Sequence, residues 1–209
     1  MEGKKISKAV IKRLPRYYRY LEGLMQENVE RISSKDLSER MHVTASQIRQ
    51  DLNNFGGFGQ QGYGYNVSYL HDEIGKILGL DTKHNMIIIG IGNIGRALVG
   101  YLSPELDGFH LTGLFDADPR KIGETVSDLT IRSIDDLPAF VQENHVDIAV
   151  VAVPGEYARD VADIIIKNGI KAIWNFTLTD LNLVVPKGVA CENVHLLESL
   201  MRLSYKSMH

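Results

Sequence analysis

The sequence lacks the residues that disulfide frameworks, thiolate metal sites and membrane spans require. Its 209 residues include one cysteine, Cys191, so no disulfide can form within the chain and paired thiols cannot sense redox state. No stretch approaches the ~18 apolar residues of a membrane span, and the basic N-terminus has neither the apolar run nor the cleavage site of a secretory signal. We therefore expect a cytoplasmic protein in which any redox sensing depends on a bound cofactor.

Acidic residues are also missing from the segment between Lys4 and Arg19, which is rich in Lys and Arg. Residues 1–80 carry 12 Lys and Arg against 9 Asp and Glu, whereas the rest of the chain carries 11 against 17. The first part therefore has an electrostatic reason to bind a polyanion, although the basic segment can equally be a solvated helix face. The length favours two domains, because one domain commonly holds ~100 to 150 residues.

The first 52 residues show the pattern of a helix-turn-helix. Apolar spacing predicts a helix from about Ser7 to Gln26, with Pro15 as a kink or break. A second helix is expected to start at Ser34 as its N-cap and to end near Met41. A third follows after a short link, with Thr44 as its N-cap and apolar residues facing inward. Two short helices joined by a tight link are typical of a DNA-binding unit.

Residues 53–65 contain five glycines interleaved with aromatic residues, which predicts a glycine-bent β-hairpin, or wing. One more amphipathic helix is expected from Ser68 to Leu80, its apolar side formed by Leu70, Ile74, Ile77 and Leu78. The polar residues 81–85 then mark a domain boundary, so residues 1–80 are expected to form a winged helix.

A dinucleotide-binding fingerprint follows this boundary. Met86–Ile89 reads as a buried parallel strand, and a G-x-G-x-x-G turn leads from it into a helix that continues through Arg96. The first glycine turns the chain, the second lets the backbone approach a pyrophosphate, and the third lets helix and strand pack closely. The anion would rest on the helix N-terminus. We expect the whole turn to bind cofactor: Gly90, Ile91, Gly92, Asn93, Ile94 and Gly95.

Asp116 ends the next apolar strand, at about the ~20-residue distance at which a ribose-binding acid is expected. A carboxylate there favours NAD(H) over NADP(H), although Arg120 and Lys121 are close in sequence and a loop-capping role for Asp116 stays open. Further strands at 147–153 and 171–176 alternate with helices, which predicts a doubly wound parallel sheet. The loop at Val153 and Pro154 lies where a nicotinamide would reach.

Enzymatic features are absent from the sequence. It has no nucleophile elbow, P-loop or metal-ligand cluster, and His145 and His195 fall in no obvious acid and base arrangement. A dehydrogenase usually adds a substrate domain behind its dinucleotide half, and none is recognisable here. We therefore expect neither a metal site nor catalysis, and we expect cofactor binding itself to be the output.

The chain resembles the Rex family of redox-sensing transcriptional repressors from end to end. The resemblance rests on residues 43–52, the glycine-aromatic wing 55–65, the fingerprint 90–95 and the segment 153–157. It implies an α/β protein with a winged helix, a Rossmann domain at 84–192 and, at 193–209, a C-terminal helix (about Leu196–Tyr205) swapped within a homodimer. It also implies that the dimer binds a palindromic operator in its apo or NAD⁺ form and that NADH releases it.

The resemblance also assigns roles to individual residues. Side chains of the second helix of the helix-turn-helix would face the major groove, the wing would enter the minor groove, and early arginines would bind phosphate. The DNA-binding residues implied in this way are Thr44, Ser46, Gln47, Arg49, Gln50, Gln60, Gln61, Arg13 and Arg16. Of these, Arg and Gln have donor patterns suited to guanine and adenine edges.

Three further positions are implied as parts of the switch. Tyr101 matches a tyrosine near the nicotinamide, and Arg19 matches an arginine at the domain interface; core packing and an ordinary surface charge are their alternatives. The sequence departs from the family at His195, where several members have an aspartate that pairs with these groups. A histidine there would make the switch sensitive to pH, because histidine commonly changes charge near neutral pH.

Three alternatives stay open at this point. The chain could be an NAD-dependent enzyme with an accessory winged helix, or its Rossmann-like half could bind coenzyme A or another adenine nucleotide. It could also be a DNA-binding protein whose acidic half serves only for dimerisation. Asp116 argues for the free ribose hydroxyls of NAD(H), because coenzyme A carries a 3′-phosphate.

Overall fold

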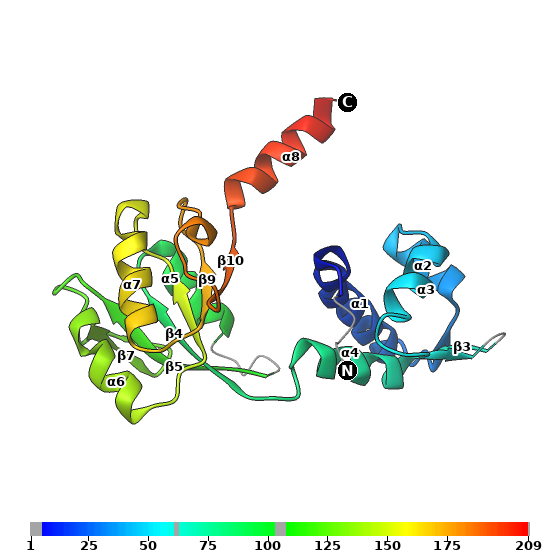
Figure 1. Cartoon of the computed structure of the whole chain (residues 1–209), viewed down its shortest axis with the longest axis horizontal. Helices are drawn as coiled ribbons and strands as arrows, with labels where there is room; N and C mark the ends of the chain where they lie inside the picture. The colour runs from blue at the N-terminus through cyan, green and yellow to red at the C-terminus, as the bar shows by residue number, and fades with distance from the viewer. Residues whose placement is uncertain (1–5, 61–62, 103–107, 209) are drawn as a thin grey trace. The chain divides into compact units, whose positions relative to one another are not determined.

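The computed structural model describes residues 6–60, 63–102 and 108–208, and contacts divide the chain into two compact units, residues 1–81 and 82–209. Within its described residues, the first unit holds four helices and a small sheet of strand order β1-β3-β2, in which both pairs are antiparallel. Its four helices and β3 are labelled in Figure 1. Its elements are α1 (Lys8–Gln26), β1 (Arg31–Ile32), α2 (Ser34–Met41), α3 (Ala45–Leu52), β2 (Gly59–Gln60), β3 (Gly64–Asn66) and α4 (Val67–Leu78). This is a winged helix, in which β2 and β3 form the predicted hairpin.

Helix α1 runs through Pro15 without a break, and Pro15 lies on its exposed side. Its N-terminus is capped by Ser7, whose hydroxyl accepts a hydrogen bond from the backbone N–H of Val10. The side chains that face the core share a helical spacing and pack against α2, α3 and α4. In α1 the buried residues are Val10, Leu14, Tyr17, Leu21 and Leu24.

Two predictions about the first unit were wrong. The N-cap of α2 is Ser33, whose hydroxyl accepts the backbone N–H of Asp36 at 3.1 Å, and Ser34 is already helical. Strand β1 ends at Ile32, which leaves Ser33 with the extended backbone that an N-cap requires. Ile77, in the last turn of α4, is 36% exposed and lies outside the buried cluster that takes up Leu70 and Ile74, so the core of the unit does not cover this side chain.

The predicted cap of α3 was confirmed. The hydroxyl of Thr44 accepts the backbone N–H of Gln47 at 3.1 Å, which satisfies one of the free donors at the helix N-terminus. Strand β1 was not predicted, because two residues are too short to show the alternation of a strand.

The second unit contains a seven-stranded sheet of order β10-β9-β8-β4-β5-β7-β6. Six strands are parallel, and β6 pairs with β7 in the antiparallel sense. Counted in chain order from β4, the parallel strands run 3-2-1-4-5-6, the order of a Rossmann fold. The strands are β4 (His84–Ile89), β5 (Phe109–Asp116), β6 (Thr125–Val126), β7 (Leu129–Ser133), β8 (Ile148–Val151), β9 (Ala172–Asn175) and β10 (Ala190–Asn193).

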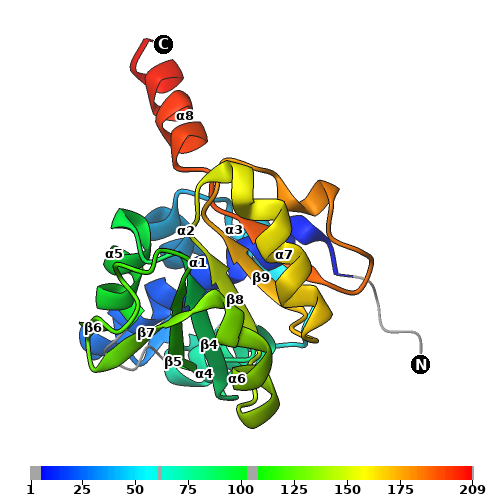
Figure 2. The same ribbon diagram turned by 90° about the vertical axis from the view of Figure 1, so that its left-hand side faces the viewer.

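Helices cover both faces of this sheet, as Figure 2 shows with α5 on one side and α6 and α7 on the other. Alternate residues of β4 point to opposite faces: Ile87 and Ile89 pack under α6 and α7, and Met86 and Ile88 pack under α5. The fold is therefore doubly wound, as predicted. The helical elements are α5 (Asn93–Leu102), η1 (Ile134–Asp136), α6 (Leu137–Glu143), η2 (Gly155–Tyr157), α7 (Ala158–Lys167), η3 (Leu181–Leu183) and α8 (Leu196–Met208).

Candidate cofactor cleft and nucleic-acid interface

The glycine-rich turn connects β4 to α5, and each glycine has a separate structural reason. Gly90 adopts φ +95°, and a Cβ there would lie 2.7 Å from the backbone of Ala152. A Cβ on Gly95 would lie 2.0 Å from the carbonyl oxygen of Gly90, so only glycine permits this approach of α5 to the turn. Around the corresponding position on Gly92, no atom of the described residues beyond Gly92 and its two chain neighbours lies within 4 Å. The middle glycine therefore faces space that a pyrophosphate can enter.

Asp116 stands at the carboxyl end of β5 and is 7% exposed. Its Oδ2 accepts the backbone N–H of Ile91 at 2.8 Å and Lys121 Nζ at 2.9 Å, and its Oδ1 accepts the backbone N–H of Asp118 at 2.9 Å. Burial alone would raise the pKa of Asp116, but these hydrogen bonds outweigh it and hold the pKa below its usual value. Asp116 is thus an ionised carboxylate that braces the glycine-rich turn.

A cleft of about 500 Å³ lies between the turn, Asp116 and the loop after β8. Among the predicted cofactor residues, Gly90, Gly92, Asp116, Val153 and Pro154 line it. Ile91 is fully buried beneath the turn, and Asn93 and Ile94 are exposed at the start of α5. The cleft lies at the carboxyl ends of β4 and β8, where the strand order reverses and where ligands of doubly wound sheets bind.

Several residues of the cleft were not among the predicted cofactor residues. They belong to the loop after β5 and to the first turns of the helix after β8, and they include Asp118, Lys121, Tyr157 and Asp160. From the sequence, Lys121 was expected only to be a positive charge close to Asp116. Its hydrogen bond to Asp116 follows from the way the β5 loop folds back, which sequence spacing alone does not indicate.

Tyr101 does not line this cleft. It is 61% exposed near the end of α5, whereas the cleft adjoins the other end of that helix at Gly92. At a rise of 1.5 Å per residue, the nine positions from Gly92 to Tyr101 correspond to roughly 13 Å along the helix. The structure therefore does not support Tyr101 as a contact to the cofactor of its own chain.

A buried polar network joins the cleft loop to the start of α8. Asn175 is fully buried at the end of β9 and donates to Asn193 Oδ1, at the end of β10, and to the carbonyl of Thr179, both at 2.7 Å. The Thr179 hydroxyl donates to the carbonyl of Gly155 at 3.0 Å. His195 follows β10 and is half-buried. These amides fix the segment from which α8 departs.

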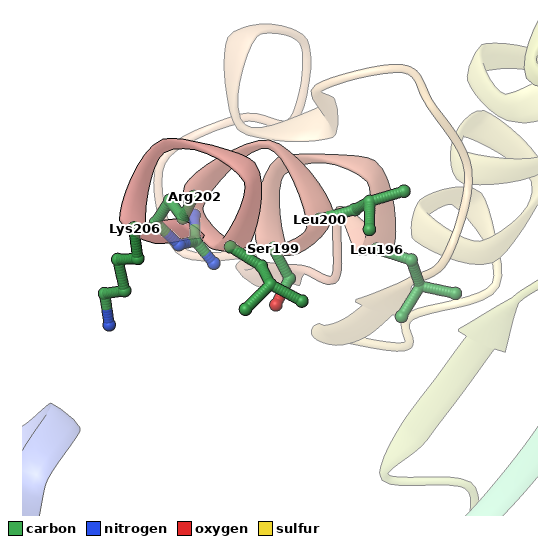
Figure 3. Close-up of a pocket in the computed structure, with 6 residues that line it drawn as sticks. Leu196, Ser199, Leu200, Arg202 and Lys206 are labelled. Atoms are coloured by element: carbon green, nitrogen blue, oxygen red, sulfur yellow. The ribbon is translucent and has the colours of Figure 1, made fainter. Parts of the chain in front are cut away.

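Helix α8 has no buried residue along the described Leu196–Met208. Its exposed apolar side chains are too numerous for a solvated helix, and Leu196, Leu200 and Leu203 line an open groove along it (Figure 3). Figure 2 shows the helix standing away from the sheet of its own unit. The large apolar residues at least half exposed are Leu196, Leu197, Leu200, Met201, Leu203, Tyr205 and Met208.

In the first unit, the predicted recognition helix is α3. Thr44, Ser46, Arg49 and Gln50 are exposed on or beside it, and Gln47 is half-buried. Arg49 donates to the Ser34 hydroxyl at 2.9 Å, which orients it across α2. Within the described part of the wing, Gln60 ends β2, and the predicted Gln61 lies outside the described residues.

A buried carboxylate, Asp51 of α3, binds two residues that were predicted to contact DNA. It is 0% exposed and accepts Arg13 Nε at 2.6 Å, Arg13 Nη2 at 2.8 Å and Gln47 Nε2 at 2.7 Å. Burial alone would raise the pKa of Asp51, but hydrogen bonds from Arg13, Tyr17 and Gln47 hold it below its usual value. This cluster was not predicted, because Arg13 and Asp51 are 38 residues apart in the sequence.

The early arginines therefore have structural partners in addition to any role at phosphate. Arg13 is committed to Asp51, and Arg16 donates to the carbonyl of Met41, the last residue of α2. Arg19 is exposed on α1, with its guanidinium carbon 5.8 Å from the centre of the Tyr20 ring. Of the three, Arg19 keeps the most accessible charge.

Neither a metal site nor a membrane span is found in the described ranges. No group of three or more His, Cys, Asp or Glu residues there could hold a metal ion, and no helix there is long and apolar enough to cross a membrane. Burial raises the pKa of the Cys191 thiol to about 11, so it stays protonated at neutral pH. His145 is exposed and pairs with Asp147 at 2.8 Å, in the manner of a surface histidine.

Two family models match the two halves of the chain. Residues 5–53 match a model described as "Putative DNA-binding protein N-terminus", and residues 81–179 match one described as "CoA binding domain". A winged helix joined to a Rossmann unit with a nucleotide-sized cleft defines the class of ligand-responsive DNA-binding regulators.

Relatives and solved structures narrow this class. A redox-sensing transcriptional repressor Rex of Caldicellulosiruptor bescii is 55% identical over 97% of this chain and 93% of its own length. The Rex of Clostridioides difficile is 54% identical over 97% and 96%. A structure of RSP in complex with β-NAD⁺ and operator DNA has a TM-score of 0.92 at 53% identity, covering 97% of this chain and 93% of RSP. A structure of RSP with β-NADH has a TM-score of 0.89 at 50% identity, covering 97% and 94%. The chain belongs to the Rex family of redox-sensing transcriptional repressors.

Proposed function

We propose that this chain represses transcription as a homodimer that binds a palindromic operator when apo or bound to NAD⁺ and leaves it when NADH binds. The observation that carries the proposal is the open space above Gly92, beside the ionised Asp116, in a chain whose other unit is a winged helix. The cleft is large enough for part of a dinucleotide and offers a helix N-terminus to its pyrophosphate. No catalysis is part of the proposal, and the cytoplasm is where such a repressor meets the chromosome.

On the cofactor side, Gly90–Gly95 would hold the pyrophosphate and Asp116 the adenosine ribose. Three donors already occupy Asp116, but a carboxylate has about four acceptor sites, so one ribose hydroxyl can still bind. Val153 and Pro154 would border the nicotinamide. The structures of RSP with β-NAD⁺ and with β-NADH support this ligand class.

On the DNA side, the N-terminal part of α3 would enter the major groove and the wing around Gln60 and Gln61 the minor groove. Exposure on or beside α3 supports base or phosphate contacts by Thr44, Ser46, Arg49 and Gln50, and the half-buried Gln47 stays partly accessible for such a contact. Arg13 and Arg16 would add mainly to the positive potential, because their guanidinium groups also hold the helices together.

The exposed apolar side of α8 supports the swapped dimer, because a second copy of the chain is the partner that this family uses. We assign residues 1–80 to the winged helix, 84–192 to the Rossmann domain and 193–209 to the swapped helix. Tyr101 and Arg19, both exposed, and the half-buried His195 would form the contacts that change between the two cofactor states.

The matched "CoA binding domain" model favours one second candidate, in which the cleft takes coenzyme A or another adenine nucleotide. The Asp116 carboxylate disfavours a phosphate on the ribose, whereas Lys121 beside it would attract one. Thermal unfolding with each nucleotide separates the candidates, because a ligand at 100 times its dissociation constant adds about 2.7 kcal/mol of stability.

The direct test measures fluorescence anisotropy of a labelled palindromic operator while NADH is titrated against a constant excess of NAD⁺. Salt is held fixed, because phosphate contacts make affinity strongly dependent on salt. We expect NADH to release the DNA and further NAD⁺ to restore binding. If neither NADH nor NAD⁺ changes the affinity for DNA, the redox-sensor proposal is rejected, and binding of coenzyme A or an enzymatic activity becomes the better explanation of the cleft.

The same titration at pH 6 and pH 8 examines His195. If His195 takes part in the switch, the NADH concentration that releases half of the DNA differs between the two pH values, and His195→Asp removes most of that difference. Equal midpoints in the unmodified protein would exclude this role for His195.

A further inference from the structure

One polar cluster of the first unit connects the body of the winged helix to a side chain of its recognition helix. Asp51 lies within α3 and is fully buried. Two of its partners, Arg13 and Tyr17, come from α1, and the phenol of Tyr17 donates to Asp51 Oδ2 at 2.8 Å. The third partner is Gln47, one turn earlier on α3. The carboxylate therefore accepts hydrogen bonds from two side chains of α1 and, in addition, from the Gln47 amide of its own helix.

The chemistry of Asp51 determines which way round the Gln47 amide lies. An ionised carboxylate can only accept hydrogen bonds, and the donors around Asp51 keep it ionised. The amide must therefore turn its nitrogen toward Asp51 Oδ1, as the 2.7 Å contact has it, and its carbonyl oxygen away. A flipped amide would place its oxygen against the buried Asp51 carboxylate, and two acceptors in contact at such a partly buried site are costly.

With one N–H bound to Asp51, Gln47 still offers an acceptor and one donor in a fixed order. Gln47 is the third residue of α3, in the part of a recognition helix that contacts base edges. An acceptor beside a donor matches the 6-amino group and N7 of adenine in the major groove. Guanine presents two acceptors on the same edge, so its O6 would meet the carbonyl oxygen of Gln47.

We propose that Asp51 is a positioning residue that locks the Gln47 amide so that it reads adenine at one position of each operator half-site. The inference rests on the proposed operator binding and adds to it a specificity determinant. Gln50 provides a contrast on the same helix, because it is exposed and lies outside this cluster.

The test begins with the full-length protein and a pool of palindromic duplexes randomised within each half-site. The duplex that the protein enriches is then resynthesised with single adenines replaced, in both halves, by purine, which lacks the 6-amino group, or by 7-deazaadenine, which lacks N7. Anisotropy at fixed salt gives the affinity for each duplex.

For the unmodified protein, we expect at least one adenine at which either analogue weakens binding about tenfold or more, the size of a good bidentate contact. In Gln47→Leu, that adenine and its two analogues should bind equally. In Asp51→Asn, which lets the amide flip, the penalty at the same adenine should fall to about twofold while other positions keep theirs. Gln26→Leu, which removes an exposed glutamine at the end of α1 that is assigned no DNA contact, is the matched control, and it should leave the penalty at that adenine intact.

A purely structural role for Asp51 is separated by Tyr17→Phe. This variant removes one hydrogen bond from Asp51 Oδ2 and lowers stability, but it leaves the Oδ1 contact to Gln47 and should keep the tenfold discrimination. If Asp51→Asn does not fold, the triple variant Arg13→Met, Tyr17→Phe, Asp51→Leu replaces the cluster by apolar groups and should show the same loss of discrimination.

Two results would overturn the inference. Unchanged discrimination in Gln47→Leu would show that Gln47 does not read this base, and unchanged discrimination in Asp51→Asn or the triple variant would show that Asp51 does not orient it. If the unmodified protein enriches no duplex, the proposed operator binding itself fails, which is a different outcome from both.

Discussion

The two units of this protein place their functional chemistry in different parts of the chain. In the Rossmann unit, the cleft depends on the backbone of three glycines within six residues. Gly90 turns the chain, Gly92 leaves space for a ligand, and Gly95 lets α5 approach the turn closely. In the winged helix, the recognition surface depends on side chains from distant helices, held by the buried Asp51. A local backbone requirement therefore produces a recognisable motif in the sequence, whereas pairing between side chains far apart in the chain produces no such motif.

The largest expected effect comes from a substitution in the glycine-rich turn, where the backbone itself forms the cleft. Gly95→Ala places a Cβ 2.0 Å from the carbonyl oxygen of Gly90, so α5 or the turn must shift. We expect a loss of about 3 kcal/mol in the stability of the Rossmann unit, at the upper end of overpacking costs, together with loss of nucleotide binding. Trp174 lies on β9 and is the single tryptophan, so its fluorescence reports unfolding of this unit.

The control is Gly100→Ala on the same helix, where, apart from its chain neighbours and the helix's own backbone, no atom of the part of the chain that the structure describes lies within 4 Å of the new Cβ. Its stability should rise by about 0.5 kcal/mol, because alanine favours the helix. Equal destabilisation of both variants would mean that the close approach at Gly95 is not the cause.

A similar loss should follow from breaking the side-chain cluster. Asp51→Asn removes the buried carboxylate that pairs with the Arg13 guanidinium. We expect this change to lower stability by about 3 kcal/mol, with the effect confined to the winged helix. Circular dichroism during denaturation should report it, while Trp174 fluorescence remains unchanged. A shift of the fluorescence transition would contradict the assignment of the effect to one unit.

The same variant has a defined dependence on pH. The pKa of Asp51 in the folded protein lies below its unfolded value of ~3.9, so its stabilisation is complete above that pH and is lost as pH falls through the folded value. The stability difference between the two proteins should therefore be constant from pH 5 to pH 8 and narrow below about pH 4. A difference that grows on acidification would reverse the assigned sign.

An intermediate effect separates folding from binding at the cleft. Gly92→Ala adds a Cβ into open space, so the stability of the free protein should change by less than about 0.5 kcal/mol. The same methyl group stands where the pyrophosphate would approach, and NADH affinity should fall about tenfold or more, which is at least ~1.4 kcal/mol. Isothermal titration calorimetry measures the affinity, and undiminished binding would place the ligand elsewhere.

The smallest effects distinguish two adjacent serines at the start of α2. Ser33→Ala removes the N-cap and should cost about 1 kcal/mol. Ser34→Ala removes only the exposed hydrogen bond to Arg49 and should cost less than about 0.5 kcal/mol. Denaturation of the winged helix monitored by circular dichroism gives both values, and the reverse order would restore Ser34 as the cap.

Much of the fold was predictable because local patterns carried it. The apolar run of β4, the glycine-rich turn and the alternation of strands and helices predicted the doubly wound sheet, and the caps and glycines predicted the winged helix. One error arose because two adjacent serines, Ser33 and Ser34, are equally suitable as the N-cap of α2. The other arose because the burial of Ile77 depends on which other elements pack over it.

At the candidate sites, the turn from Gly90 to Gly95 and Asp116 were predictable from spacing, but the partners of their side chains were not. Lys121 reaches Asp116 only because the loop after β5 folds back. Arg13 was assigned to phosphate by resemblance, and the structure pairs it with a carboxylate on another helix. Tyr101 was assigned to the cofactor by resemblance, and it lies outside the cleft of its own chain.

The sequence by itself determined the backbone of this protein: where glycine is required, where strands are buried on both faces, and which segments are helical. These depend on steric limits and on periodicity, which act between residues close together in the chain. Only the tertiary structure decided which charges are paired and which amides are oriented, as with Asp51 and Gln47. The free energy of a buried polar group depends on every donor and acceptor around it, and folding brings those from elements that sequence distance keeps apart.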